Sequence, residues 1–368
     1  MLRALELASR GLMTTHPNPR VGCVIVGGGE VIAEGWHRRA GDPHAEALAL
    51  GQAGGRARGS TVYLTLEPCS HSGRTPPCVE ALVRAAPARV VVAMQDPNPQ
   101  VNGRGIDRLR EAGIEVSVGL CAARAAALNR GFVSRMRRGR PWVISKIAAS
   151  VDGRIALGSG VSKWITSTQS REDVQQLRAC CSAVLTGIGT VLADDPSLNV
   201  RLDEASRQPL RVICDTRLRM PRSSRTLGLE GEVLIATASR DAALRAPLLA
   251  SGAKFLDIGE RGGRLDLAEV MNCLAEREVN EVLVEAGPVL NGALIDSRLI
   301  DELVVYFAPS LIGSDGRGMF DLAGVVTMSD KVECSFIDCT RVGPDMRLRL
   351  LLAGKPESDV YGHHTGHG

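Results

Sequence analysis

Residues 60–78 read STVYLTLEPCSHSGRTPPC, and this stretch predicts a strand, a loop and the start of a helix. The β-branched and aromatic residues of its first half favour a strand, which delivers Glu67, Pro68 and Cys69 at its end. The continuation PPCVEALVRA (76–85) is typical of a helix that begins near Cys78. Each cysteine directly follows a proline, and each lies at the junction of the loop with a regular element.

The rest of the first third also alternates between strand and helix. Apolar runs at 21–26 and 30–37 are joined by three glycines, which predicts a hairpin. Residues 44–54 predict a helix that opens at His44, 88–98 a strand, and 105–119 a helix followed by a strand. Such alternation predicts an α/β domain with a mostly parallel sheet.

A second α/β pattern begins at WVISKIAAS (142–150) and has no short repeat. The basic segment RMRRGRPW (135–142) contains Gly and Pro and is the predicted linker. We therefore expect one domain over 1–140, a second over 141–354, and a disordered tail over 355–368. Strands are expected at 142–150, 183–188, 210–215, 232–237, 254–258, 281–287 and 302–309, and helices at 170–181 and 266–278.

Composition excludes several classes of partner. The chain has 368 residues with 44 basic and 41 acidic side chains, a balance that argues against nucleic acid or an anionic membrane surface. Aromatic residues make up only 3%, and no run of 18 apolar residues occurs. Ten cysteines are scattered along the chain, and the first residues lack the pattern of a secretory signal. We expect a cytoplasmic protein with reduced thiols, some of which are free to bind a metal.

The first candidate site consists of His44, Cys69, Cys78 and Glu46. Zinc prefers thiolate and imidazole ligands, and a catalytic site holds three protein ligands and a water. His44 and Cys78 lie near predicted helix starts, where the partial positive charge stabilises a thiolate. Zinc lowers the pKa of a water that it binds to about 7, and Glu46 is near enough in sequence to move its proton to a leaving amine.

This pattern is that of zinc deaminases, H-x-E followed by P-C-x-x-C, with one departure. Eight residues separate the two cysteines here instead of two, and no CxxC pair occurs in the chain. Alternatives are unrelated thiols beside a capping histidine, a zinc-stabilised binding module, or a nucleic-acid deaminase. A structural zinc site has no need of a carboxylate beside the metal, so Glu46 favours catalysis. Balanced charge and the second domain argue against a nucleic-acid substrate.

The departure points to a family. The segments THPNPRVGCVIV (15–26), GDPHAEALAL (41–50), TLEPCSHSGRTPPC (65–78) and MQDPNPQVNGRG (94–105) resemble the bifunctional deaminase/reductase of riboflavin biosynthesis. The resemblance extends from about residue 1 to about residue 352. It implies a cytidine-deaminase-like three-layer domain that hydrolyses the ring 2-amino group of a diaminopyrimidinone ribosylamine 5′-phosphate. A homo-oligomer is also expected from the family.

The loop between the cysteines would then form a wall of the substrate pocket. His71, Arg74 and Thr75 could meet a phosphate or ribose, or could be solvated loop residues. Asn18, between two prolines, could hydrogen-bond the base or sugar. Asp96 and Asn98 are weaker candidates, because turn chemistry explains them equally well. Cys23 lies in an apolar strand and is expected in the core.

The second domain lacks metal-ligand spacing and a GxGxxG fingerprint. It contains VEAGPVLNGALI (284–295), a strand, a Gly-Pro turn and a helical pattern, which could approach a pyrophosphate or be a plain tight turn. Together with SKIAASVDGRIA (145–156), WITS (164–167) and TGIGTVLADDPSLNVR (186–201), it resembles the reductase half of the same enzyme. That half is dihydrofolate-reductase-like and reduces the ribosyl group to ribityl with NADPH.

The residue roles in this half follow partly from the resemblance, which implies the substrate and cofactor contacts, and partly from side-chain chemistry, which suggests Lys146, Asp194 and Arg217. Arg178 and Arg201 suit a phosphate, since a guanidinium binds it bidentately. Lys146 and Asp194 are candidates to deliver or orient the proton, although Lys146 could be a surface lysine at a strand edge. Arg217 could bind the 2′-phosphate of NADPH or be an exposed surface arginine. The cofactor would be lined by Ala148, Trp164, Thr190, Asp194, Thr216, Gly287, Pro288, Val289, Leu290, Asn291, Gly292 and Ala293, and the substrate by Ser162, Arg178, Leu198, Arg201 and Glu285.

Overall fold

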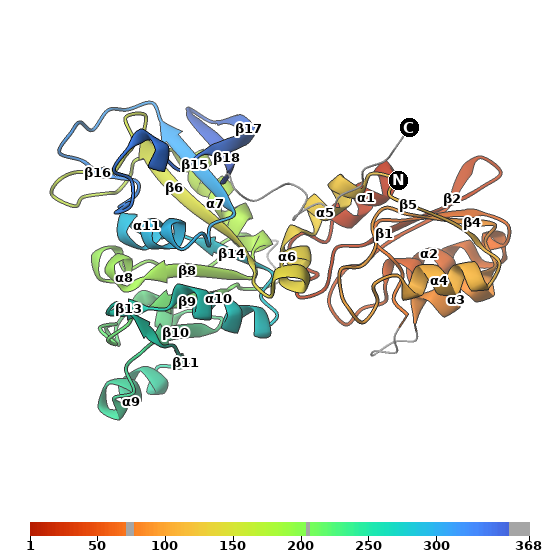
Figure 1. Cartoon of the computed structure of the whole chain (residues 1–368), viewed down its shortest axis with the longest axis horizontal. Helices are drawn as coiled ribbons and strands as arrows, with labels where there is room; N and C mark the ends of the chain where they lie inside the picture. Colours follow the sequence, from red (N-terminus) through yellow and green to blue (C-terminus); the bar gives the residue numbers. More distant parts are fainter. Residues whose placement is uncertain (71–76, 204–206, 353–368) are drawn as a thin grey trace. The chain divides into compact units, whose positions relative to one another are not determined.

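A computed structural model describes residues 1–70, 77–203 and 207–352. The described chain forms two compact units, residues 1–139 and residues 140–352 (Figure 1). Each unit is built around its own sheet and its own apolar core. No helix in these described ranges is long and apolar enough to cross a membrane.

The N-terminal unit contains a five-stranded mixed sheet in the order β2-β1-β3-β4-β5. The predicted hairpin is confirmed, because β1 and β2 pair antiparallel around the glycine turn. β3, β4 and β5 pair parallel, whereas β1 pairs antiparallel with both β2 and β3. Four of the five strands therefore run in one direction, as expected of a mostly parallel sheet, and β1 alone opposes them. The hairpin reverses the chain before the first strand–helix–strand unit begins. The strands are β1 Gly22–Gly27, β2 Glu30–Trp36, β3 Thr61–Leu64, β4 Arg89–Val92 and β5 Glu115–Val118.

Helices cover both faces of this sheet and give three layers (Figure 1). Side chains alternate along β1, so Cys23 and Ile25 pack toward α2 and α3 while Val24 packs toward α1. Cys23 is fully buried, as expected for a core residue. The helices are α1 Leu2–Ser9, α2 Ala45–Ala53, the short 3-10 helix η1 Gly54–Ala57, α3 Cys78–Ala85, α4 Arg104–Glu111, α5 Ala122–Leu128 and α6 Arg130–Arg138.

The first half of the predicted linker is helical. Residues 135–138 are the last turn of α6, and Gly139 ends this helix with a φ of 66°. Only a glycine adopts this left-handed conformation without strain, and it makes a common helix C-terminus. The basic side chains of Arg135, Arg137 and Arg138 lie in the last turn, where they complement the helix dipole.

The C-terminal unit contains a nine-stranded sheet in the order β11-β10-β9-β8-β14-β6-β15-β18-β17. Seven strands from β11 to β15 run parallel, and β18 and β17 are antiparallel additions at one edge. All seven predicted strands of this half are present, whereas β17 and β18 were not predicted. The strands are β6 Trp142–Ser150, β8 Ala183–Gly187, β9 Leu210–Cys214, β10 Val233–Thr237, β11 Lys254–Asp257, β14 Glu281–Val284, β15 Glu302–Ala308, β17 Cys334–Val342 and β18 Asp345–Leu352.

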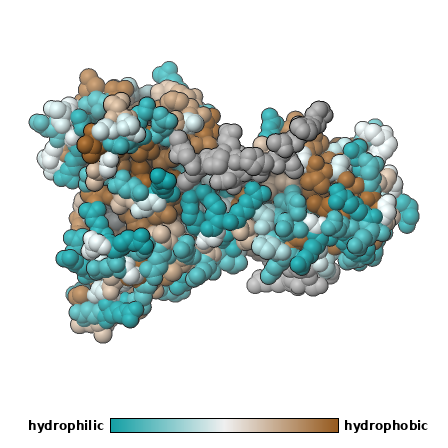
Figure 2. Space-filling view, viewed as in Figure 1, coloured by the Kyte–Doolittle hydropathy of each residue, from teal (hydrophilic) through white to brown (hydrophobic). Residues whose placement is uncertain are grey.

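Helices pack on this sheet and bury a large aliphatic core that includes Val143, Leu185, Val282 and Leu294. Both predicted helices are present, as α7 and α10. Figure 2 shows apolar surface over the part of this unit that contains β15, β17 and β18; Val326, Met328 and Phe336 are strongly exposed. The remaining elements are β7 Arg154–Ala156, α7 Thr168–Cys180, α8 Ile188–Asp194, η2 Arg225–Gly228, α9 Ala242–Ala250, β12 Glu260–Arg261, β13 Arg264–Leu265, α10 Leu267–Glu276, α11 Pro288–Asp296, β16 Arg317–Gly318 and η3 Met328–Asp330.

Candidate functional site

Three potential metal ligands converge in the N-terminal unit. His44 caps the start of α2, Cys78 is the first residue of α3, and Cys69 lies in the loop after β3. His44 Nδ1 lies 3.1 Å from Cys78 Sγ and 3.6 Å from Cys69 Sγ. The three ligand atoms lie within 4.8 Å of one another. Two thiols and one imidazole nitrogen form a donor set that suits zinc and leaves one tetrahedral position for a reactant.

The electrostatics of this cluster favour a thiolate. The Cys78 backbone N–H donates to Cys69 Sγ at 3.3 Å. Hydrogen bonds from the Cys78 thiol and from His44 lower the pKa of Cys69, although burial opposes the shift. The same hydrogen bond with Cys69 raises the pKa of the Cys78 thiol. The Cys69 sulfur, which accepts the first N–H of α3, is therefore favoured as a thiolate, the form that binds a metal.

Glu46 lies in the first turn of α2, two residues after His44 and close enough to the three ligands to interact with them electrostatically. Its side chain is buried, and its Oε2 has no hydrogen-bond partner among the described residues. Burial raises the pKa of Glu46, and the charge of His44 partly offsets this effect. A buried carboxyl oxygen without a partner costs free energy, so its retention points to a chemical role.

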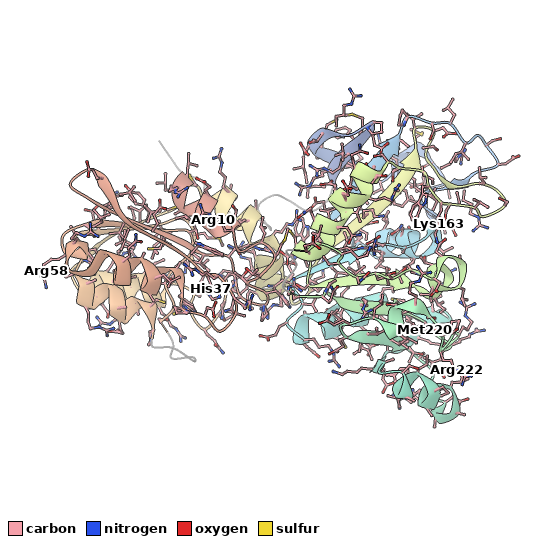
Figure 3. All side chains as sticks on the ribbon, turned by 180° about the vertical axis from the view of Figure 1, so that it is seen from behind. Arg10, His37, Arg58, Lys163, Met220 and Arg222 are labelled. Atoms are coloured by element: carbon pink, nitrogen blue, oxygen red, sulfur yellow. The ribbon has the colours of Figure 1, made fainter. Side chains whose placement is uncertain are left out.

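His37 connects a second predicted residue to this cluster, and sequence reasoning did not single it out. The imidazole follows β2 and is buried (Figure 3). Its Nε2 lies 3.0 Å from Asn18 Nδ2, and its ring meets the His44 ring edge-on at a centroid distance of 5.4 Å. The available signal was a histidine directly after an apolar strand, seven residues before His44. Asn18 is therefore close to the metal-ligand cluster.

The remaining predicted residues of this half are those of the loop between the two cysteines and Asp96. His71, Arg74 and Thr75 lie outside the described residues. Asp96 is buried, and its Oδ1 accepts the backbone N–H of Asn98 at 2.8 Å. A carboxylate that accepts the backbone N–H two residues on is typical of a turn, which is the alternative to a substrate-binding role in the QDPNPQ segment (95–100).

In the C-terminal unit, Glu285 lies at the centre of a charged group. It follows β14 directly, and Arg178 of α7 contacts both of its carboxylate oxygens at 2.5 and 3.0 Å. Lys146 Nζ lies 3.3 Å from Glu285 Oε2. Burial alone would raise the pKa of Glu285, but the charges of Arg178 and Lys146 outweigh it and lower the pKa to about 2. Lys146 lies on β6, an interior strand, so the surface strand-edge alternative is wrong.

The neighbouring substrate candidates approach the same group from the segment after α8. Arg178 Nη1 donates to the Asn199 carbonyl at 2.9 Å, and Arg201 Nη1 donates to Asn199 Oδ1 at 3.0 Å. Leu198 is buried and has a φ of 55°. Arg201 is exposed, so one guanidinium of this pair is buried on a carboxylate and the other faces solvent.

A second polar contact joins the segment before α7 to α8. Ser162 Oγ donates to Asp194 Oδ1 at 3.3 Å, and Lys163 Nζ donates to the Asp194 carbonyl at 3.1 Å. Trp164 is largely exposed, and the Arg171 guanidinium lies over its ring at 4.5 Å. An exposed indole next to Arg171 of α7 offers a flat surface on which a planar ring can stack.

The Gly-Pro turn after β14 leads into α11. Gly287 is the N-cap of this helix and Pro288 its first residue, which suits proline because that N–H has no helical partner. Thr190 Oγ1 faces Gly287, since a side chain at Gly287 would begin 4.0 Å from it. A Cβ on Gly292 would lie 1.9 Å from the Asp321 carbonyl oxygen, so only glycine fits there. Val289 and Leu290 lie in the first turn of α11, and Ala293 in its second.

The remaining cofactor candidates lie on or after parallel strands of the same sheet. Ala148 is in β6, and Thr216 and the exposed Arg217 follow β9. Asn291 is buried; its Nδ2 donates to the Ala286 carbonyl and its Oδ1 accepts from Ser145. Because β9, β8 and β14 are neighbours and parallel, the segments after them meet at one edge of the sheet, where open α/β sheets bind ligands.

Comparison with known proteins agrees with this division. Residues 1–94 match the cytidine and deoxycytidylate deaminase zinc-binding region, and residues 141–348 match the RibD C-terminal domain. The chain is 50% identical to the riboflavin biosynthesis protein RibD of Escherichia coli, over 95% of this chain and 98% of the relative. It is 45% identical to RibD of Haemophilus influenzae, over 96% of this chain and 97% of the relative.

Solved structures give the same result. One form of Acinetobacter baumannii RibD is 45% identical and superposes with a TM-score of 0.89, covering 96% of this chain and 97% of that one. A diaminohydroxyphosphoribosylaminopyrimidine deaminase/5-amino-6-(5-phosphoribosylamino)uracil reductase from Thermotoga maritima is 33% identical with a TM-score of 0.86, at the same coverage.

Proposed function

The chain belongs to the RibD family of riboflavin biosynthesis, and on that premise we propose that His44, Cys69 and Cys78 hold the zinc ion of its deaminase half. The resemblance seen in the sequence is confirmed, as is the fold class of a cytidine-deaminase-like domain followed by a reductase domain. The protein is a bifunctional enzyme that uses zinc in one half and NADPH in the other. It deaminates the diaminopyrimidinone ribosylamine 5′-phosphate and then reduces 5-amino-6-(5-phosphoribosylamino)uracil to the ribitylamino product.

One observation carries the assignment of the deamination site. Two thiols and an imidazole converge within 4.8 Å beside a buried carboxyl group whose Oε2 has no partner among the described residues. Zinc supplies a Lewis acid that activates water at neutral pH. Glu46 is the group that takes a proton at its Oε2 and passes it to the leaving amine. Asn18, held against His37, is proposed to orient the pyrimidine or its sugar.

Cys78→Ser tests this site directly. The hydroxyl is a poor zinc ligand at neutral pH, so the variant is expected to lose the metal and its deaminase activity. Zinc per chain is measured by elemental analysis, and deamination by a two-step assay on the diaminopyrimidinone ribosylamine 5′-phosphate with and without NADPH. Cys121→Ser is the matched control, because that thiol is half-buried, lies in the same unit and is not one of the three clustered ligands. Full zinc occupancy in Cys78→Ser would remove Cys78 from the ligand set.

For the reductase half, we propose that Glu285, Arg178, Arg201, Ser162 and Leu198 contact the substrate. The charged group at Glu285 supports this role, since it is buried and lies at the carboxyl end of β14. NADPH supplies the hydride, and reduction of the open-chain sugar also needs a proton. We propose that Lys146, whose Nζ lies 3.3 Å from Glu285 Oε2, holds this proton. Asp194 is proposed to orient the proton donor and the substrate through its hydrogen bond with Ser162.

The cofactor site is proposed to include Ala148, Trp164, Thr190, Thr216, Arg217 and the start of α11. This proposal is supported by the sheet topology, because the segments that follow β8, β9 and β14 lie together at one edge of the sheet. The N-terminus of α11 offers backbone N–H groups that suit the pyrophosphate. The protein binds a small substrate, with no sign of nucleic acid or membrane. We further propose that it works as a homo-oligomer in the cytoplasm; the ten free cysteines support a reducing compartment.

A further inference from the structure

Glu67 is a buried carboxylate that no step of the proposed chemistry uses. It lies two residues before Cys69, in the segment that follows β3. Its Oε2 accepts the backbone N–H groups of Asp96 at 3.0 Å and Gly103 at 2.9 Å. Its Oε1 accepts those of Gly105 at 2.9 Å and Ile106 at 3.3 Å. A single side chain therefore binds four backbone donors from a segment that is remote in sequence.

Three of these donors belong to the start of α4. Gly103 is the N-cap of this helix, and no side chain of its own caps it. Gly105 and Ile106 follow in its first turn, where N–H groups have no helical partner. Glu67 thus caps α4 from a distance, and its negative charge faces the positive end of the helix dipole.

Two glycines bring α4 close to the metal-ligand loop. Gly103 has a φ of 92°, which favours glycine. A Cβ on Gly105 would lie 2.2 Å from the Pro68 carbonyl oxygen. The start of α4 therefore contacts the backbone of Pro68, directly before Cys69, and the absence of a side chain at Gly105 makes this contact possible.

We propose that Glu67 is a positioning residue of the deamination site, which fixes the backbone at Pro68 and Cys69 against the start of α4. This inference rests on the proposed zinc site. Cys69 lies in a loop and has no helix of its own, unlike His44 and Cys78, which begin α2 and α3. The start of α3 holds Cys69 through hydrogen bonds to its sulfur and its carbonyl, and the cluster at Glu67 adds a second support at the two residues before it. Residues that orient metal ligands without touching the metal typically change affinity or activity by about 10–100-fold.

Thermodynamic coupling gives a test on the unaltered full-length enzyme. If the cluster stabilises the ligand geometry, zinc must stabilise the cluster to the same extent. Amide hydrogen exchange at Gly103, Gly105 and Ile106 is measured with zinc bound and after chelation. Exchange at these amides is expected to accelerate about tenfold or more on zinc removal, while amides in β11 stay unchanged. Equal exchange in both states would overturn the proposal.

The variant Glu67→Gln tests the same point from the other side. Its amide group would direct N–H donors at two backbone N–H groups, so the cluster loses part of its bonding. Zinc release to a chromogenic chelator is expected to be at least about tenfold faster than in the unaltered enzyme. Cobalt-substituted enzyme should also show a changed thiolate-to-cobalt absorption. Glu34→Gln is the control, because it removes an ion pair with Arg3 in the same unit, away from the site.

The outcomes separate two roles of Glu67. Faster release and a changed spectrum in Glu67→Gln, but not in Glu34→Gln, support positioning. A lowered melting temperature with unchanged release and spectrum assigns Glu67 to folding alone and overturns the proposal. If Glu67→Gln does not fold, the exchange measurement decides. Failure of the unaltered enzyme to bind zinc would instead contradict the metal site itself.

Discussion

At the residue scale, Glu46 combines burial with an unpaired carboxyl oxygen. Such a group costs stability, because desolvation is not offset by a hydrogen bond. Its neighbour His44 is a proposed metal ligand, so the side chain is placed where a proton must move during deamination. The loss of folding stability caused by its burial accompanies this position.

Glu46→Gln should separate metal binding from proton transfer. The amide keeps the size of the side chain but cannot accept a proton, so zinc should stay while deamination falls by about 10²–10⁴-fold. Reduction of pre-deaminated substrate should continue, because the proposed reductase residues lie in the other unit. Zinc content and both activities are measured on one preparation. Near-normal deamination with zinc bound would contradict the assigned role of Glu46.

The ion pairs of Glu285 should make the stability of the C-terminal unit depend on pH in the acid range. Its pKa is lowered to about 2 in the folded state, below the ordinary value of 4.5. A depressed pKa stabilises the fold above the unfolded-state value, and this contribution is lost as pH falls from about 4.5 toward 2. The melting temperature of the unaltered protein should therefore exceed that of Glu285→Gln at pH 6. The difference should shrink as the pH is lowered through this window, measured by circular dichroism. A constant difference would show that the carboxylate charge contributes nothing.

At the element scale, the ends of strands carry most of the candidate chemistry. Cys69 follows β3, Glu285 follows β14 and Thr216 follows β9. Within each sheet, parallel strands place their carboxyl ends at one edge, so residues far apart in sequence but in the same unit meet there. The starts of α2, α3 and α11 lie next to these ends and offer N–H groups and partial positive charge.

The loop after β9 predicts the cofactor preference. Arg217 is exposed there, where its guanidinium could meet the 2′-phosphate that distinguishes NADPH from NADH. Arg217→Ala should raise the KM for NADPH about tenfold while the KM for NADH changes little. Arg222→Ala, at another exposed arginine, is the control. Equal changes for both cofactors would remove Arg217 from the site.

At the scale of the whole molecule, each unit has its own sheet and its own core. Every residue proposed for deamination lies before position 100, and every residue proposed for reduction lies after 145. More than 130 residues in each half are enough to bury an independent core.

We therefore expect the fragment 141–354 to fold and to reduce deaminated substrate without zinc. NADPH oxidation is followed at about 340 nm in the presence of a chelator, and folding by circular dichroism. The fragment 1–140 should bind zinc and deaminate. If the folded fragment 141–354 is inactive and adding fragment 1–140 restores turnover, the reductase site is shared between the halves.

Local sequence determined much of this protein. The β-branched runs at 142–150, 183–188 and 210–215 predicted β6, β8 and β9, because an apolar run bounded by turn signals needs no distant partner to be recognised. His44, Glu46, Cys69 and Cys78 could be grouped because zinc chemistry restricts the residue types and their order.

The tertiary structure alone decided the remaining features. β1 runs antiparallel to β3, β18 pairs antiparallel with the last parallel strand β15, and β17 pairs antiparallel with β18. Glu67 binds backbone groups at positions 96 to 106, and Arg178 and Lys146 share Glu285. Strand direction and such contacts depend on which surfaces meet after the chain has folded, and no local window of sequence contains that information.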